Sequence, residues 1–263
     1  MIGKVLTIAG SDCSGGAGIQ ADIKTITMHG CYAMNVITSL TAQNTTEISG
    51  IFDVTPEFAA KQLDAVFTDI FPDAVKIGMV SNSDIINIIA EKLKEYAPKH
   101  IVVDTVMIST SGYSLLKKDA SDALVEKLLP IAEVITPNIP EAENLTGMRV
   151  QNTDDMIKAA KYLSDELKTA VLIKGGHLNG LAEDILCETR HKITVFSSER
   201  IATNNTHGTG CTLSSAIASN LSMGMSLKES IGKAKKYVSD AMLAGLDLGN
   251  GNGPLNHFYS INQ

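Results

Sequence analysis

The chain has 263 residues, of which 44% are hydrophobic, and its formal net charge is −7. This length and apolar content predict one α/β domain over residues 1–263. The acidic balance argues against binding nucleic acid or an anionic membrane through a global positive field, so any phosphate must be held by a local site.

The pattern of apolar residues predicts strands that alternate with helices. Five short segments rich in Val and Ile are expected to be buried strands: Lys4–Ala9, Ala74–Ile77, His100–Val103, Glu133–Ile135 and Ala170–Ile173. Helical patterns lie between them, at Glu57–Phe67, Ser83–Tyr96 and Thr153–Leu167. Further strands, some of them antiparallel, are expected at Ala33–Thr38, Glu47–Val54 and Asp184–Phe196. This order is typical of a mostly parallel sheet covered on both faces, with ligands bound beyond the carboxyl ends of its strands.

A glycine-rich segment, Gly10 to Gly18, follows the first predicted strand. Residues 16–21 fit the dinucleotide pattern G-x-G-x-x-A, but no acidic residue for a ribose stands between Ile37 and Thr46. A P-loop would need Lys and Ser or Thr after Gly15, and Gly16 and Ala17 stand there instead. Two interpretations stay open: a tight strand-to-helix turn, or a substrate loop in which Asp12 is free to bond a hydroxyl.

A second small-residue loop, Asn204 to Leu213, precedes an apolar helix that we expect to begin near Gly208. Residues 201–227 contain no charged side chain, but their many polar and glycine residues argue against a membrane span. The first amides of a helix have no internal partner and lie at the positive end of its dipole, so this loop could hold an anion without Lys or Arg. A purely structural capping turn is the alternative. The helical pattern restarts near Leu227.

The cysteines and the N-terminus indicate a cytoplasmic protein. The four cysteines, Cys13, Cys31, Cys187 and Cys211, form no C-x-x-C pair, so we expect reduced thiols rather than a zinc site. Cys13, Cys31 and Cys187 are interpreted as small packing residues. The first apolar stretch breaks at Gly10 with no basic region before it, which argues against a secretory signal.

Several motifs stand in one order along the chain: residues 9–22, Thr41–Thr45, Lys76–Met79, Thr136–Glu143, Lys174–His177 and Gly208-Thr209-Gly210-Cys211. Together they resemble the motifs of the hydroxymethylpyrimidine/phosphomethylpyrimidine kinases of the ribokinase-like superfamily. Residues 208–211 are similar to the superfamily's anion-hole motif, with Cys where most members have a catalytic Asp. The likeness extends from Lys4 to about Phe258, and it implies a three-layer α/β/α fold with a mostly parallel central sheet, ATP and Mg²⁺ as cofactors, and a homodimer.

The resemblance also implies a role for each site residue. Amides of Gly208, Thr209, Gly210 and Cys211 would hold the transferring phosphoryl group, with Cys211 as catalytic base. Lys174 and Thr209 would contact ATP, and Asp104 and Glu141 would serve magnesium. The acceptor would be a small pyrimidine bound by Gln43, Asp12, Gly10, Met79 and Val106. The chain departs from the family pattern at Thr105, where Pro is usual, and at Cys13, where Ser is usual.

Three alternatives to a pyrimidine kinase are open. A pyridoxal or pyridoxine kinase would share this scaffold, and Gln43 favours the pyrimidine because its amide can pair with an amine beside a ring nitrogen. A nicotinamide-dependent oxidoreductase rests on residues 16–21 alone. A ligand-binding module without activity would be expected to lose Lys174, Glu141 or Cys211, and all three are present.

Overall fold

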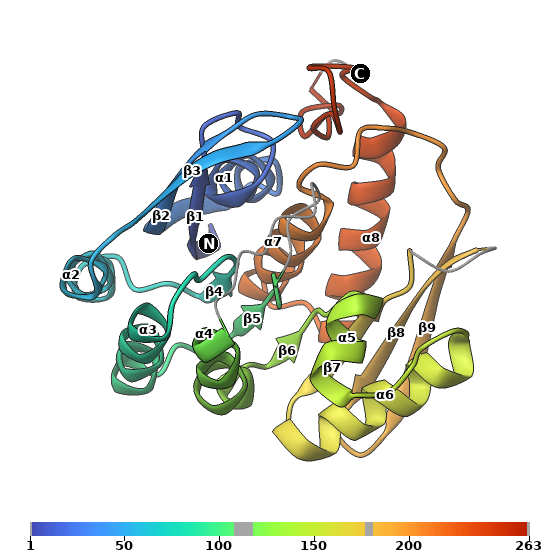
Figure 1. The fold of residues 1–263 in the computed structure, drawn as a ribbon, viewed down its shortest axis with the longest axis horizontal. Helices are drawn as coiled ribbons and strands as arrows, with labels where there is room; N and C mark the ends of the chain where they lie inside the picture. Colours follow the sequence, from blue (N-terminus) through green and yellow to red (C-terminus); the bar gives the residue numbers. More distant parts are fainter. Residues whose placement is uncertain (1, 108–117, 177–180, 262–263) are drawn as a thin grey trace.

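The computed structural model describes residues 2–107, 118–176 and 181–261. Its strands form a single sheet in the order β3-β2-β1-β4-β5-β6-β7-β8-β9 (Figure 1). The strands are β1 Lys4–Asp12, β2 Tyr32–Gln43, β3 Ile48–Asp53, β4 Ala74–Ile77, β5 Ile101–Val103, β6 Val134–Ile135, β7 Ala170–Lys174, β8 Ala182–Glu188 and β9 Lys192–Ser198. The six strands from β2 to β7 in the sheet are parallel, whereas β3, β8 and β9 pair antiparallel.

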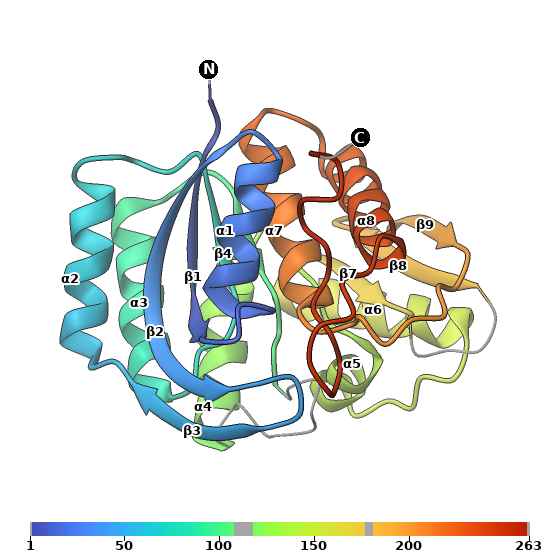
Figure 2. The same cartoon turned by 90° about the horizontal axis from the view of Figure 1, so that it is seen from above.

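Helices cover both faces of the sheet, as the alternation of strand side chains requires. Leu6 of β1 packs in the core under one layer of helices, and its neighbour Val5 in the core under the other. One layer holds α1 Gly18–Met28, α7 Thr209–Ser222 and α8 Leu227–Leu243. The other holds α2 Pro56–Phe67, α3 Ser83–Tyr96, α4 Lys118–Ala123, the short turns Leu124–Leu128 and Leu129–Ile131, α5 Ile139–Thr146 and α6 Thr153–Leu167. The expected three-layer α/β/α fold is confirmed (Figure 2).

The predicted elements recur with few changes. Helices α3 and α6 have the predicted bounds, and an Asn side chain caps the first turn of each. The first strand is longer than predicted, because β1 continues through Gly10 to Asp12. The segment Asp184–Phe196 is two strands, β8 and β9. Their connection places Arg190 and His191 at positive φ, which non-glycine residues seldom adopt, so the sequence gives no turn signal there.

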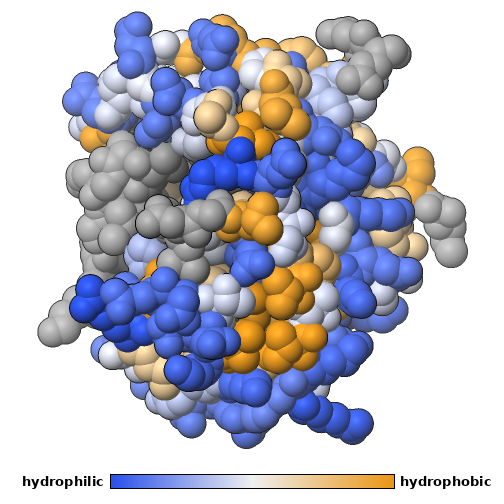
Figure 3. All heavy atoms as spheres, turned by 90° about the vertical axis from the view of Figure 1, so that its right-hand side faces the viewer, coloured by the Kyte–Doolittle hydropathy of each residue, from blue (hydrophilic) through white to orange (hydrophobic). Residues whose placement is uncertain are grey.

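The distribution of apolar residues over the surface and the described helices argues against a membrane span, as the sequence predicts. In Figure 3 apolar side chains form separate patches among hydrophilic ones. Among the described residues, no helix combines the length and apolar character needed to cross a bilayer. Helix α7, Thr209–Ser222, packs between α1 and α8 and is almost wholly buried. This burial explains why the helix carries no charged side chain.

Candidate active site

The predicted site residues gather at the carboxyl edge of the parallel strands. Asp12 and Gln43 end β1 and β2, and Lys174 ends β7. The remaining residues follow β4, β5 and β6 or stand at the start of α7: Met79, Asp104, Val106, Glu141, Gly208, Thr209, Gly210 and Cys211. Parallel strands bring their carboxyl ends to one edge, which is why residues far apart in sequence meet here.

The two glycine-rich loops pack directly against each other. A side chain at Gly16 would meet the His207 ring, since an ideal Cβ there lies 2.3 Å from His207 Cδ2. Gly208 has φ +85°, and an ideal Cβ on it would lie 1.9 Å from the carbonyl oxygen of Gly16. Both positions therefore require glycine, and the contact joins the loop after β1 to the start of α7. Five residues lie between the end of β1 at Asp12 and the start of α1 at Gly18.

Asp12 organises the first loop. One carboxylate oxygen accepts hydrogen bonds from the Ser14 amide and hydroxyl, and the other accepts from the amides of Gly16 and Ala17. His207 Nε2 lies 2.8 Å from this second oxygen. Burial alone would raise the pKa of Asp12, but the hydrogen bonds from His207, Ser14 and Ala17 outweigh it and lower the pKa. Of the two interpretations left open for this loop, the tight turn agrees with these bonds, since the Asp12 carboxylate is engaged by the loop itself. Its contact with a substrate stays a prediction.

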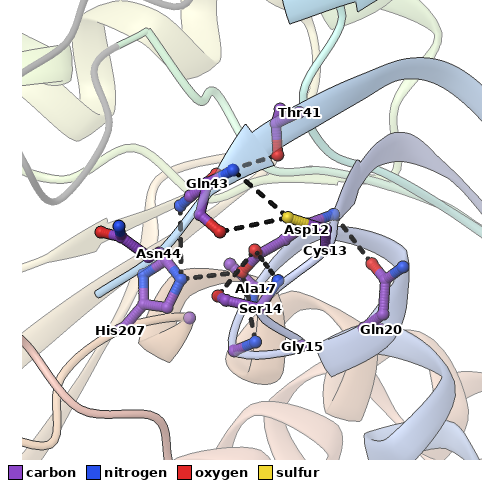
Figure 4. A network of polar contacts seen from close by, with 12 residues as sticks. Asp12, Cys13, Ser14, Gly15, Ala17, Gln20, Thr41, Gln43, Asn44 and His207 are labelled. Carbon is purple, nitrogen blue, oxygen red and sulfur yellow. Dashed lines mark hydrogen bonds and ion pairs between the residues drawn. The ribbon is translucent and has the colours of Figure 1, made fainter. Parts of the chain in front are cut away.

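Gln43 and His207 lie next to each other at the edge of this network (Figure 4). Gln43 Nε2 is 3.4 Å from His207 Nε2, and Gln43 Oε1 is 3.2 Å from the Thr41 hydroxyl. Cys13 is exposed and its thiol bonds to the backbone of Gln43, so it is not a core packing residue. Cys31 and Cys187 are buried, as expected. His207 was not predicted as a site residue, because its partner Asp12 is 195 residues away in sequence.

The start of α7 has the features of an anion site. No side chain caps this helix, and its first amides have no partner within it. An ideal Cβ on Gly210 would lie 3.1 Å from Asp104 Oδ2 and 3.4 Å from Lys174 Nζ. The absence of a side chain at Gly210 thus lets the helix start approach these two charged groups closely. The capping-turn interpretation stays open beside it, because the Thr209 amide and hydroxyl both donate to the carbonyl oxygen of Thr206.

Lys174 is paired rather than solvated. Its ammonium lies 2.8 Å from Asp104 Oδ1, and the Thr136 hydroxyl donates to the same oxygen. Burial would lower the pKa of Lys174, but the Asp104 and Glu141 carboxylates outweigh it and raise the pKa. Burial would raise the pKa of Asp104, but Lys174 and Lys76 outweigh it and lower the pKa. Both groups therefore stay charged at neutral pH.

Glu141 caps α5 and faces the same charges. Its Oε2 accepts from the Asn138 amide and from the Thr105 hydroxyl, while Asn138 Oδ1 accepts from the Glu141 amide. Thr105, where the family has Pro, thus adds a hydrogen bond that Pro could not make. Burial raises the pKa of Glu141, with Lys174 opposing the rise and Asp104 adding to it.

Asp104 and Glu141 fit a magnesium site that is completed by phosphate and water. Among the described residues, no group of three or more His, Cys, Asp or Glu side chains is placed to hold a metal. Magnesium binds through one or two carboxylates together with substrate phosphates and keeps several waters. Asp104 lies beside the helix start and Glu141 interacts with the same Lys174, so these two carboxylates suit that kind of ion.

Replacing Asn138 with alanine should lower the free energy of unfolding by about 1 kcal/mol, because one N-cap hydrogen bond is lost. It should also weaken catalysis, since Asn138 holds the backbone turn that carries Glu141. Asn152→Ala is the matched control, because Asn152 makes the same cap on α6. Urea unfolding should show similar losses for both variants, and initial rates a loss for Asn138→Ala alone. Equal rates in the two variants would contradict the assignment of Glu141.

A buried ion pair lies beneath Cys211. Lys76 and Asp22 are fully buried, and the Lys76 ammonium lies 2.8 and 2.9 Å from the two Asp22 oxygens. Asp22 also accepts from Ser215 on α7 and Thr7 on β1, so it ties α7 to the sheet. Burial raises the pKa of the Cys211 thiol to about 11, with Lys76 opposing the rise. The pair was missed because nothing in the sequence marks Asp22 and Lys76 as partners.

The apolar residues expected to line the acceptor are less closely defined. An ideal Cβ on Gly10 would lie 3.2 Å from Met79 Sδ and 2.9 Å from Ser39 Oγ, so Gly10 lets Met79 approach β1. Met79 and Val106 are both half-buried. Their contact with a substrate ring stays a prediction.

The comparisons with known proteins agree on one family. A family model described as phosphomethylpyrimidine kinase matches residues 12–256. The chain is 45% identical to the hydroxymethylpyrimidine/phosphomethylpyrimidine kinase of Rhizobium meliloti, with 98% of each chain covered. It is 50% identical, over 97% of its length, to the thiamine biosynthesis bifunctional protein ThiED of Geobacter sulfurreducens, and it spans about half (52%) of that longer protein.

Solved structures share the fold. A phosphomethylpyrimidine kinase of Clostridium difficile superimposes with a TM-score of 0.82 at 49% identity, covering 91% of this chain and 99% of that one. A pyridoxal kinase of Bacillus subtilis in complex with ADP superimposes with a TM-score of 0.91 at 38% identity, covering 98% of each chain. The shape is therefore common to both kinds of kinase, whereas the sequence is closer to the first.

Proposed function

This chain belongs to the phosphomethylpyrimidine kinase family, and we propose that it phosphorylates hydroxymethylpyrimidine and then the resulting monophosphate, with Mg-ATP as the phosphoryl donor. The observation that supports this most is the position of Gln43 beside His207, because His207 stands only four residues before Cys211 in the first turn of α7. A group that could read a ring edge would then lie close to a helix start that could hold a phosphoryl group. The protein would act in the cytoplasm as a homodimer.

Each part of the site has a definite task in this transfer. Phosphoryl transfer depends on alignment and charge neutralisation more than on covalent chemistry. The amides of Gly210 and Cys211 donate to the transferring group, and the Lys174 ammonium neutralises charge beside it. Thr209 stands at the same helix start and would contact ATP there, with its hydroxyl hydrogen donated to the carbonyl oxygen of Thr206. Magnesium, held by Asp104 and Glu141 through waters, would neutralise the phosphate oxygens.

The test is an ATP-consumption assay with purified protein and five acceptors: hydroxymethylpyrimidine, its monophosphate, pyridoxal, pyridoxine and ribose. We expect turnover of the first two to exceed that of the others. Faster turnover of pyridoxal or pyridoxine would favour the vitamin B6 alternative, which rests on the same fold. If none of the five acceptors supports consumption of ATP, the proposal is overturned.

Replacing Gln43 with methionine should separate the acceptors. Methionine keeps the length of the side chain but removes both hydrogen-bonding groups, and each substrate group left unpaired costs about 1–3 kcal/mol. We expect KM for hydroxymethylpyrimidine to rise roughly tenfold or more, with a smaller change for pyridoxine. Gln62→Met is a matched control, because within the described residues the Gln62 side chain, on α2, bonds only to the backbone of Ile37. Equal losses on both acceptors would show that Gln43 does not read the ring.

A further inference from the structure

His207 faces two partners with a single ring nitrogen. Its Nε2 lies 2.8 Å from Asp12 Oδ2 and 3.4 Å from the terminal nitrogen of Gln43 (Figure 4). Asp12 is ionised at neutral pH, because its hydrogen bonds lower its pKa. An ionised carboxylate can only accept, so Nε2 must carry the hydrogen. The Gln43 NH₂ group, which is also a donor, would then face the His207 N–H with no acceptor between them.

The opposite orientation of the Gln43 amide satisfies every group. The amide oxygen and nitrogen have nearly the same shape, so the hydrogen-bond network decides which atom faces which partner. With its oxygen toward His207, Gln43 accepts a share of the Nε2 hydrogen. Its nitrogen then faces the Thr41 hydroxyl, whose own hydrogen is donated to the carbonyl oxygen of Ser11 at 3.0 Å. The Thr41 oxygen is thus left to accept from the amide.

This arrangement leaves a defined edge for a ligand. A primary amide offers two lone pairs and two N–H groups. His207 takes one lone pair and Thr41 takes one N–H, so one acceptor and one donor remain side by side. An aminopyrimidine has the complementary edge, an amine next to a ring nitrogen. The amine would lie toward His207, and the ring nitrogen toward Thr41.

We infer that His207 is a positioning residue that fixes the orientation of the Gln43 amide and so determines which way round the acceptor ring is bound. This rests on the proposed function of Gln43 in reading the ring. In hydroxymethylpyrimidine the hydroxymethyl group is on the carbon next to the one that bears the amine, on the side away from the paired nitrogen. With the amine toward His207, the hydroxymethyl group extends toward the residues that follow His207, which are Gly208 to Cys211.

A reversed amide would bind the ring turned over. The amine and ring nitrogen would exchange places, and the hydroxymethyl group would point away from the start of α7. Such binding is unproductive: it occupies the site without transfer, so it lowers kcat without raising KM. Loss of Gln43 itself should have the other signature, a rise in KM, because it removes binding from every orientation.

The experiment is a double-mutant cycle of His207→Leu and Gln43→Met, with kcat and KM measured on hydroxymethylpyrimidine. We expect His207→Leu to lower kcat roughly tenfold with no rise in KM. In the Gln43→Met background, the same change should alter kcat by less than about twofold, since no amide is left to orient. His207→Gln, which keeps an N–H donor of similar reach, should restore part of kcat. Where His207→Leu does not fold, His207→Met, which also lacks an N–H donor, supplies the same comparison.

A structural effect on the loop would give a different result. His257 is also buried, and its Nε2 lies 2.9 Å from the Thr212 hydroxyl on α7, so His257→Leu tests loosening of that helix. Loosening should lower turnover of pyrimidine and pyridoxine alike and to the same extent in both backgrounds. If His207→Leu behaves in that way, the inference is overturned while Gln43 keeps its role. If Gln43→Met changes neither kcat nor KM for the pyrimidine, the proposed role of Gln43 is wrong, and the inference on His207 falls with it.

Discussion

Replacing Lys174 with methionine should reduce turnover on every acceptor by about 10²–10³-fold, the usual cost of losing one preorganised charge or donor at the reacting group. The loss should be the same for all acceptors, because Lys174 lies beside Gly210 at the helix start that we propose holds the transferring phosphoryl group. Methionine keeps most of the length of the side chain, so packing at the end of β7 is largely retained. Steady-state rates with saturating ATP and each acceptor measure the effect.

The same variant should shift the pH dependence in a known direction. Lys174 lowers the pKa of Asp104 and opposes the rise in the pKa of Glu141. Without it both carboxylates bind protons more readily, so the fall in activity on the acid side should begin at a higher pH. Lys174→Arg keeps the positive charge and should restore part of the rate and the original acid side of the profile.

Lys4 is the matched control for Lys174. It also pairs with a carboxylate, at 2.9 Å from Asp73, but the pair is partly exposed to solvent and lies at the start of β1, at the opposite edge of the sheet. Lys4→Met should therefore leave turnover unchanged, since an exposed ion pair contributes little. A Lys174→Met enzyme with near-normal turnover and ATP affinity would remove Lys174 from the phosphate site.

The fold could be predicted where local signals are strong. Helices α3 and α6 combine an apolar stripe with an Asn cap, and both signals lie within the segment itself. Strand ends are less certain, because pairing with a neighbour decides them. β1 continues to Asp12 because β2 runs beside it as far as Thr41, across an irregularity at Gly10. The turn between β8 and β9 has neither Gly nor Asn, so its sequence contains no residue that would predict a turn with positive φ.

The site could be predicted as a set of motifs but not as a network. The motifs predicted that Gln43, Lys174 and Cys211 lie at the carboxyl edge of the sheet, because each motif follows a strand or begins a helix. It did not show that His207 joins Asp12 to Gln43, nor that Lys76 and Asp22 form a buried pair near Cys211. Such contacts depend on how distant segments meet, which a single sequence does not encode locally.

Cys211→Ala should separate the two phosphorylation steps by their need for a base. In the first step the acceptor is an alcohol, whose proton must leave as the oxygen attacks, and a placed base contributes about 10²–10⁴-fold. In the second step the acceptor is a phosphate monoester with a second pKa of about 6, so it is already largely ionised at neutral pH. The alanine variant keeps the backbone amide of the anion site. We therefore expect a large loss on the alcohol and a clearly smaller loss on the monophosphate.

The protonation of Cys211 adds a second signature. Burial raises the pKa of its thiol to about 11, so the thiol is largely protonated at pH 7. If the thiolate is the base, turnover of the alcohol should rise about tenfold per pH unit between pH 7 and 9, since the thiolate fraction rises by that factor. Turnover of the monophosphate should be nearly flat over the same range. Cys211→Ala should remove the slope on the alcohol.

A packing role for Cys211 predicts a different pattern, and Cys31→Ala measures what packing alone contributes. Cys31 is buried, and its thiol lies 3.6 Å from the Ser222 hydroxyl at the far end of α7, so its loss loosens the same helix without touching the reaction. Both steps should be measured from their own purified acceptors, at several pH values, for the wild-type enzyme and both variants. Parallel losses of the two steps in Cys211→Ala, of the kind seen in Cys31→Ala, would show that the thiol only packs the loop. A loss confined to the alcohol and growing as pH rises would identify the thiolate as the base, because the deleted contribution is largest where the thiolate is most populated.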